Sequence, residues 1–149
     1  MELALEEAQK AAEHGDVPIG CVIVHIGNIV ASTHNRVEKD QDSTAHAEIL
    51  AIREAQKSIG YKHLLDCDMY ITLEPCAMCA GAIVLSRVNR LFIATADPKS
   101  GACGSVMDIT NNPELNHRCE VHYGIYESES SELLKNFFKK IRERNGRRS

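Results

Sequence analysis

Short apolar runs of strand length alternate with segments whose apolar residues recur at helical spacing, and this alternation limits the fold more than any other feature of the chain. Such a pattern is typical of α/β proteins, in which helices cover the faces of a sheet. Gly27 and Asn28 separate the first two runs and predict a hairpin turn between them. The runs that we interpret as strands are residues 21–25, 29–32, 69–73, 91–95 and 120–124.

The first two helical patterns have local signals for their ends. The first begins at the N-terminus, and Gly15 is a suitable stop for it. The second places apolar residues on one side between Ala45 and Ile59, and Ser43 or Thr44 could cap its N-terminus.

The last two helical patterns differ in how apolar they are. The third helix follows Pro75, runs to about residue 86 and is apolar all round, so we expect it to be buried on more than one side. The fourth carries its apolar residues on one face over 133–141. Together the elements predict a single three-layer α/β domain over residues 1–149, with a basic C-terminal helix and tail at about 130–149.

Composition points to a soluble protein of the cytoplasm. Hydrophobic residues make up 44% and charged residues 26% of the chain, as in ordinary globular domains. No apolar run approaches the roughly 18 residues that a membrane span needs, and the acidic N-terminus lacks the basic start of a signal peptide. In a reducing cytoplasm the six cysteines favour metal binding or catalysis over disulfides.

Charge is distributed unevenly along the chain. Residues 135–149 carry seven basic and one acidic side chain, a net +6, so the preceding residues carry −10 of the overall −4. A basic tail on an acidic body is a candidate surface for nucleic acid. The alternative is a solvated helix end, where cations also favour the helix dipole.

Two short motifs, each at the expected start of a helix, carry the chemistry. Cys76 and Cys79 are three residues apart, so both sulfurs lie on one helical face and can take two corners of a tetrahedron. His46 supplies a third ligand from the other helix. Three protein ligands leave the fourth zinc position for water, which is typical of a catalytic site and predicts one Zn²⁺ per chain.

Glu48 follows His46 by two residues and is the candidate catalytic carboxylate. Residues two apart do not share a helical face, so both can serve one pocket only if it lies off the end of the helix. A carboxylate there can accept a proton from water and return it to a leaving group.

Other cysteines and histidines offer alternatives. One of the four other cysteines could close a structural zinc site, although the default interpretation is that all four are small, buried, apolar side chains. The remaining histidines lack ligand spacing and suit surface or core positions. These residues are Cys21, Cys67, Cys103 and Cys119, and His14, His25, His34, His63, His117 and His122.

The combination H-x-E with P-C-x-x-C is the signature of zinc-dependent nucleoside deaminases. Across nearly its whole length the sequence resembles the bacterial-type tRNA-specific adenosine deaminases. The stretch after Thr95 is the specific part, because deaminases of free bases and nucleotides share the zinc motif but differ there. The resembling stretches are residues 16–20, 35–36, 44–48, 72–82, 97–102, 104–108, 116–118 and 137–140.

The resemblance implies a cytidine deaminase-like α/β/α fold with a five-stranded mixed sheet, a homodimer, and conversion of the wobble adenosine of a tRNA anticodon to inosine. It implies that His46, Cys76 and Cys79 bind zinc and that Glu48 shuttles protons. The partner would be the anticodon stem-loop of tRNA, whose unpaired bases can rotate into a pocket at a lower energy cost than paired ones.

By the same resemblance, Asn35 would hold the base, and Asp97 and Lys99 would line the path of the flanking nucleotides. Asn and Asp also favour turns without any ligand, so ordinary loop positions are the alternative for these residues.

Two other functions fit the motifs. A deaminase of cytidine, guanine or another small substrate would share the zinc chemistry but would not need a basic surface for RNA. A non-catalytic zinc module that binds RNA would need neither Glu48 nor an open coordination position.

Overall fold

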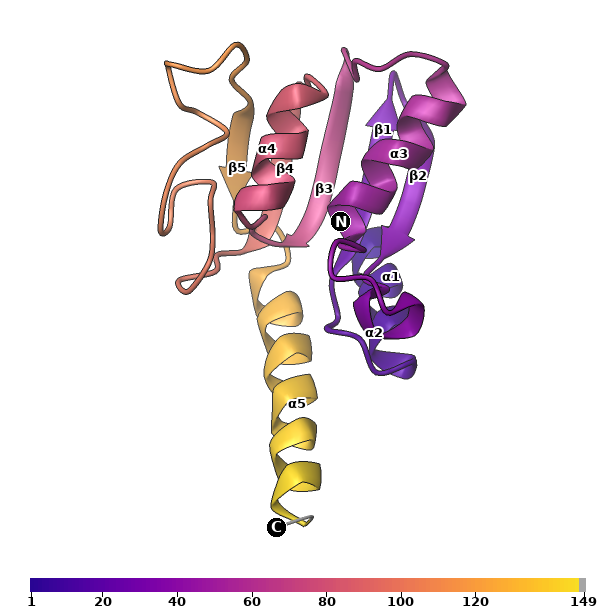
Figure 1. The fold of residues 1–149 in the computed structure, drawn as a ribbon, viewed down its shortest axis with the longest axis vertical. Helices are drawn as coiled ribbons and strands as arrows, with labels where there is room; N and C mark the ends of the chain where they lie inside the picture. Colours follow the sequence, from indigo (N-terminus) through magenta and orange to yellow (C-terminus); the bar gives the residue numbers. More distant parts are fainter. Residues whose placement is uncertain (148–149) are drawn as a thin grey trace.

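A five-stranded mixed sheet organises the chain, and the computed structural model describes residues 1–147 (Figure 1). The strand order is β2-β1-β3-β4-β5, with β1 antiparallel to both of its neighbours and β3, β4 and β5 parallel. Parallel strands end at the same edge of the sheet, so the segments that follow β3 and β4 begin close together. The strands are β1 (Gly20–His25), β2 (Asn28–His34), β3 (Cys67–Leu73), β4 (Arg90–Thr95) and β5 (Glu120–Tyr123).

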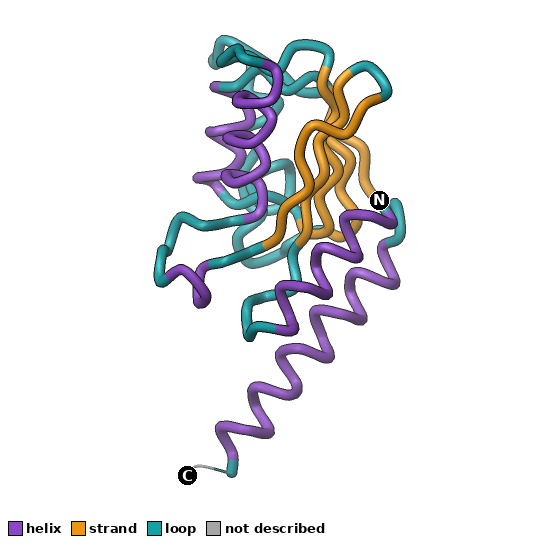
Figure 2. The backbone as a smooth tube through the Cα atoms, turned by 90° about the vertical axis from the view of Figure 1, so that its right-hand side faces the viewer, coloured by secondary structure: helices purple, strands orange, loops and turns teal. Residues whose placement is uncertain are grey.

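Helices cover both faces of the sheet, which confirms the expected three-layer α/β fold (Figure 2). On one face lie α1 (Glu2–Glu13) and α5 (Glu127–Gly146), and on the other lie α3 (Ala47–Ile59) and α4 (Ala77–Leu85). The C-terminal part of α5 extends away from the sheet (Figure 1). None of the helices in residues 1–147 is long and apolar enough to span a membrane.

The core lies mainly between the sheet and the helices α3 and α4. On α3 the buried residues Ala51, Ile52 and Ala55 recur at helical spacing, as the sequence pattern predicts. The largest fully buried apolar side chains are Ile23, Leu64, Met69, Ile71, Ile83, Val88, Leu91 and Ile93.

On the opposite face, Gly20 permits a close contact between β1 and α1. A Cβ at this position would lie 1.8 Å from the carbonyl oxygen of Ala4, so only glycine lets the helix approach this far. Ala4, Ala8 and Ala11 keep the facing side of α1 small and are fully buried.

The hairpin of β1 and β2 contains a β-bulge. Ile23 is opposite Ala31 and Val24 is opposite Ile29, so Val30 is an extra residue on β2. The hairpin turn at Gly27 agrees with the sequence prediction, and this glycine has a φ of 78°.

Three local predictions differ from the structure. The polar run from Asn35 to Asp42 predicts a loop, but it contains a short helix, α2 (Val37–Asp40), because the buried Asp16 carboxylate accepts hydrogen bonds from the backbone N–H groups of Glu38 and Lys39. Neither Ser43 nor Thr44 caps α3, which begins after His46. The α4 helix is buried on one side only, and Leu85 is 77% exposed.

Candidate active site

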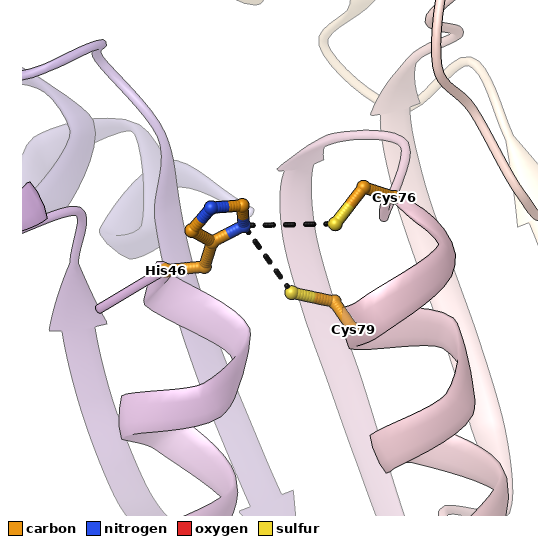
Figure 3. Close-up of side chains that lie close together, drawn as sticks. All are labelled: His46, Cys76 and Cys79. Atoms are coloured by element: carbon orange, nitrogen blue, oxygen red, sulfur yellow. Dashed lines mark hydrogen bonds between the residues drawn. The ribbon is translucent and has the colours of Figure 1, made fainter. Parts of the chain in front are cut away.

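Two helix N-termini bring His46, Cys76 and Cys79 together. His46 is the N-cap of α3, and Cys76 is the N-cap of α4, three residues after β3 ends at Leu73. The His46 Nδ1 atom lies 3.6 Å from the Cys76 sulfur and 3.5 Å from the Cys79 sulfur (Figure 3). The three candidate ligand atoms all lie within 4.8 Å of one another, as the motif spacing predicts.

The donor set fits a tetrahedral zinc ion. Zinc–sulfur bonds of about 2.3 Å and zinc–nitrogen bonds of about 2.0–2.1 Å give a tetrahedral sulfur–nitrogen edge of about 3.6 Å. The two distances from His46 Nδ1 to the cysteine sulfurs, 3.6 and 3.5 Å, agree with this edge. Two thiolates and one imidazole are ligands that zinc favours.

The thiol nearest the surface is set up to lose its proton. Hydrogen bonds with Cys79 and His46 lower the pKa of Cys76 to about 4. The contact with Cys76 in turn raises the pKa of both His46 and Cys79. A metal ion binds the deprotonated sulfur, so the lowered pKa of Cys76 favours the form of this side chain that acts as a ligand.

Glu48 lies in the first turn of α3 and is only 3% exposed. Its Oε1 atom is buried without a hydrogen-bond partner among the described residues. Burial raises the pKa of Glu48 to about 7. Leaving a buried carboxylate oxygen unpaired is costly, so such a group is more typical of a functional site than of a structural one.

Asn35 is fixed beside the same helix N-terminus. Its Oδ1 atom accepts a hydrogen bond of 2.8 Å from the backbone N–H of Ala47, which supplies the cap that Ser43 and Thr44 do not. The side chain is buried, and it lines a cavity of about 680 Å³ together with His46. The structure thus places Asn35 beside His46, one of the candidate zinc ligands.

The far wall of this cavity comes from α5. Phe137, Phe138, Ile141 and Arg144 line it opposite Asn35 and His46. The sequence pattern of α5 indicates an apolar face that packs on the body, but Ser130 is the buried residue of this helix. Apolar periodicity does not distinguish a helix that packs in a core from one that walls a cavity, so this role of α5 was missed.

Asp97 and Lys99 lie in a neighbouring cavity of about 710 Å³, whose other wall includes Lys135, Phe138 and Arg142 of α5. The two cavities adjoin, since Phe138 lines both. The Asp97 carboxylate accepts hydrogen bonds from the backbone N–H groups of Lys99 and Ser100. Asp97 therefore shapes its own turn, while Lys99 is exposed at the cavity wall.

The four other cysteines are buried, in agreement with the default interpretation for them. Within residues 1–147, the group of His46, Cys76 and Cys79 is the candidate metal cluster. One functional candidate had no role in the sequence-based interpretation, namely Glu74. An acidic residue directly after an apolar strand and before the Pro75–Cys76 motif is the signal that could have identified it.

Comparison with known proteins identifies close relatives. Residues 1–142 match the family model of the MafB19-like deaminases. The sequence is 48% identical over 142 residues to the tRNA-specific adenosine deaminase of Aquifex aeolicus, covering 95% of this chain and 93% of the relative. It is 46% identical over 144 residues to the enzyme of the same name from Bacillus subtilis, covering 97% of this chain and 89% of the relative.

Solved structures separate the fold from the specificity. A structure from a study of A-to-I editing by tRNA:A34 deaminases at the wobble position superposes with a TM-score of 0.87 at 46% identity, covering 90% of this chain and 97% of that one. A guanine deaminase from Nitrosomonas europaea has a TM-score of 0.74 at 26% identity, covering 91% and 81%. The same architecture therefore serves deaminases of different substrates, and sequence similarity favours the first group.

Proposed function

The chain matches the MafB19-like deaminase family model and belongs with the tRNA-specific adenosine deaminases, and we propose that it converts the wobble adenosine of a tRNA anticodon to inosine. The observation that carries this proposal is the similarity over nearly the full length to relatives of that name, at up to 48% identity. The site geometry alone fits any zinc deaminase. A tRNA substrate also agrees with the cytoplasmic location expected from the cysteines.

His46, Cys76 and Cys79 are the residues that would hold one zinc ion. When bound, zinc supplies a Lewis acid that makes a coordinated water much more acidic than bulk water. The chain contributes the imidazole nitrogen and the two sulfurs from two helix N-termini, whose positive dipole ends favour thiolates there.

Glu48 performs the proton transfers in this proposal. It accepts a proton from the attacking water, whose oxygen adds to C6 of the adenine, and gives this proton to ring N1. It then assists the departure of ammonia, so that water and adenosine yield inosine and ammonia. Its Oε1 atom is buried and has no hydrogen-bond partner among the described residues, which supports this role.

Asn35 and α5 are suited to hold the substrate. Asn35 uses its amide oxygen on Ala47, which leaves the amide nitrogen to donate to the adenine base. Lys99, Lys135 and Arg142 place positive charge around the neighbouring cavity, and Phe138 adds an aromatic face beside them. Basic groups with an interspersed aromatic ring are typical of sites for single-stranded RNA.

The experiment that tests the function compares substrates. The zinc-loaded protein is incubated with an anticodon stem-loop that contains the wobble adenosine, with free adenosine, with free cytidine and with guanine. We expect inosine from the stem-loop alone. Deamination of a free base or nucleoside instead would favour the small-substrate alternative, and RNA binding without deamination would favour the non-catalytic module.

The basic C-terminal segment gives a first prediction. Truncation after Ile141 removes Arg142 and Arg144, which line the two cavities, as well as Arg147. We expect weaker RNA binding, with the slope of log affinity against log salt concentration flattened by about 0.7 for each lost phosphate contact. The measurement is RNA affinity at several salt concentrations. Arg148 and Ser149 are also removed but lie outside the described residues.

The control for the tail is Lys57→Gln, which removes one exposed positive charge from α3. It should leave the salt slope unchanged. If the truncated protein keeps the full slope, the tail is merely solvated. The phosphate contacts then lie nearer the cavity, and Lys99 is the first residue to test.

A homodimer through α4 is a second proposal. Met78 and Leu85 expose apolar surface on this helix, and a hollow of about 360 Å³ beside Leu85 lies between α3 and α4. We expect Leu85→Glu to shift the protein toward the monomer, because a charge in an apolar interface stays desolvated. Sedimentation at micromolar concentration measures the mass. The control is Ile29→Glu, an exposed position on β2, and a wild-type protein that sediments only as a monomer would refute the proposal.

A further inference from the structure

Glu74 is a buried carboxylate outside the candidate zinc ligands, and it has unusually complete hydrogen bonding. It follows the last residue of β3, precedes Pro75 and is 2% exposed. Within residues 1–147 it has no ion-pair partner, so its buried charge depends on hydrogen bonds alone.

All of these hydrogen bonds come from one segment, residues 97–105, which follows β4. Glu74 Oε1 accepts the backbone N–H of Asp97 at 3.0 Å and the hydroxyl of Ser105. Oε2 accepts the backbone N–H groups of Cys103 at 3.0 Å and of Ser105 at 3.1 Å. Four donors fill the acceptor sites of one carboxylate.

The backbone around Glu74 strengthens the same attachment. The Pro75 carbonyl accepts the N–H of Ala102, so the residue directly before Cys76 is also tied to the segment. A Cβ at Gly101 would lie 2.3 Å from the Glu74 carboxyl carbon, so glycine is needed for the segment to wrap this closely.

Glu74 thereby connects the candidate metal motif with the wall of the substrate cavity. It holds the N–H of Asp97, and the Asp97 carboxylate in turn accepts the N–H of Lys99 at 3.0 Å. The carboxylates of Glu74 and Asp97 therefore act in series to fix the backbone position of Lys99. Opening this segment would break all four hydrogen bonds to the Glu74 carboxylate at once, and this loss favours the closed segment.

We propose that Glu74 is a positioning residue, which fixes residues 97–105 beside the Pro75–Cys76 turn and so presents Lys99 to the RNA that flanks the reacting base. The RNA part of this inference rests on the proposed function. The attachment of the segment does not.

Glu74→Gln is the informative variant because it keeps the size of the side chain and replaces one acceptor oxygen by an amide NH2 group, which can only donate. The amide oxygen should take the Oε2 position, where both donors are fixed backbone N–H groups. The amide NH2 group then faces the Ser105 hydroxyl and the backbone N–H of Asp97. The hydroxyl can rotate to accept a hydrogen bond, whereas the N–H of Asp97 can only donate. The substitution therefore removes the acceptor of Asp97 in particular.

Backbone amide hydrogen exchange of the zinc-loaded protein measures this without any substrate. In Glu74→Gln we expect exchange at Asp97 to rise at least about tenfold, and more than at Cys103 or Ser105. The matched control is Glu6→Gln, an exposed position on α1, which should leave exchange in the segment unchanged. Unchanged exchange at Asp97 in Glu74→Gln would overturn the inference.

Kinetics with an anticodon stem-loop tests the consequence for RNA. We expect KM to rise on the order of tenfold and kcat to stay within about threefold, with zinc content unchanged, because a displaced binding segment weakens contacts without removing a reacting group. Ser105→Ala removes one donor and should change KM in the same direction by less.

Each outcome decides one point. A lower zinc content with unchanged KM would mean that Glu74 serves the metal motif rather than the segment, and it would overturn the inference. An unchanged KM and kcat would leave Glu74 a purely structural role and would also overturn it. If the unaltered protein does not deaminate the stem-loop, the proposed function fails, whereas the exchange experiment still decides the attachment of the segment.

Discussion

Glu48→Gln should reduce kcat for the anticodon stem-loop on the order of 10²- to 10⁴-fold, the usual contribution of a general acid–base group. Glutamine keeps the shape of the side chain but cannot carry a proton between water, ring nitrogen and leaving group. Glu48 is not one of the three grouped ligand atoms, so the variant should keep its zinc. Single-turnover kinetics together with elemental analysis measures both quantities.

The matched control for this variant is Glu54→Gln, which makes the same chemical change at an exposed position of α3. It should retain full activity and zinc. Substantial turnover by a zinc-loaded Glu48→Gln protein would refute the proton-transfer role. Loss of zinc from that variant would instead indicate that the carboxylate takes part in metal binding.

Cys76→Ala should lower the zinc content from about one ion per chain to a small fraction of that and abolish deamination, because two protein ligands hold zinc far more weakly than three. The two remaining ligand atoms, His46 Nδ1 and the Cys79 sulfur, lie 3.5 Å apart and cannot complete the site alone. The measurements are elemental analysis of the purified protein and inosine formation after addition of excess zinc.

Cys119→Ala controls for the general loss of a cysteine. Cys119 is buried, and its thiol donates a hydrogen bond to the Val88 carbonyl, far from the grouped ligands in the sequence. This variant should lose some stability but keep its zinc. Equal zinc contents in Cys76→Ala and in the unaltered protein would remove Cys76 from the ligand set.

Local patterns were enough to predict most of the fold. The apolar spacing on α3 identified its buried side, and Gly27 identified the hairpin turn. The start of α3 was predicted less well. Its cap is Asn35, which is twelve residues from Ala47 and reaches it only because β2 ends beside the helix. A cap that comes from so far along the chain leaves no signal at Ser43 or Thr44.

The site divides in the same way. The candidate zinc ligands follow from short motifs, because three-residue spacing on a helix is a local property. The position of Lys99 is not local. It depends on how the segment after β4 meets Glu74 at the end of β3, and on α5 coming back to form the opposite wall. The resemblance assigned Asp97 and Lys99 to the path of the flanking nucleotides, and both residues line the cavity that adjoins the one beside Asn35.

An open sheet presents two edge strands, and unpaired backbone groups along such edges can recruit further strands and begin aggregation. Here both edges are poor templates. The edge strand β5 is only four residues long, and the other edge strand, β2, is interrupted by the bulge at Val30. Pairing of edge strands between copies of this chain is therefore disfavoured, and self-association would have to use the helical faces.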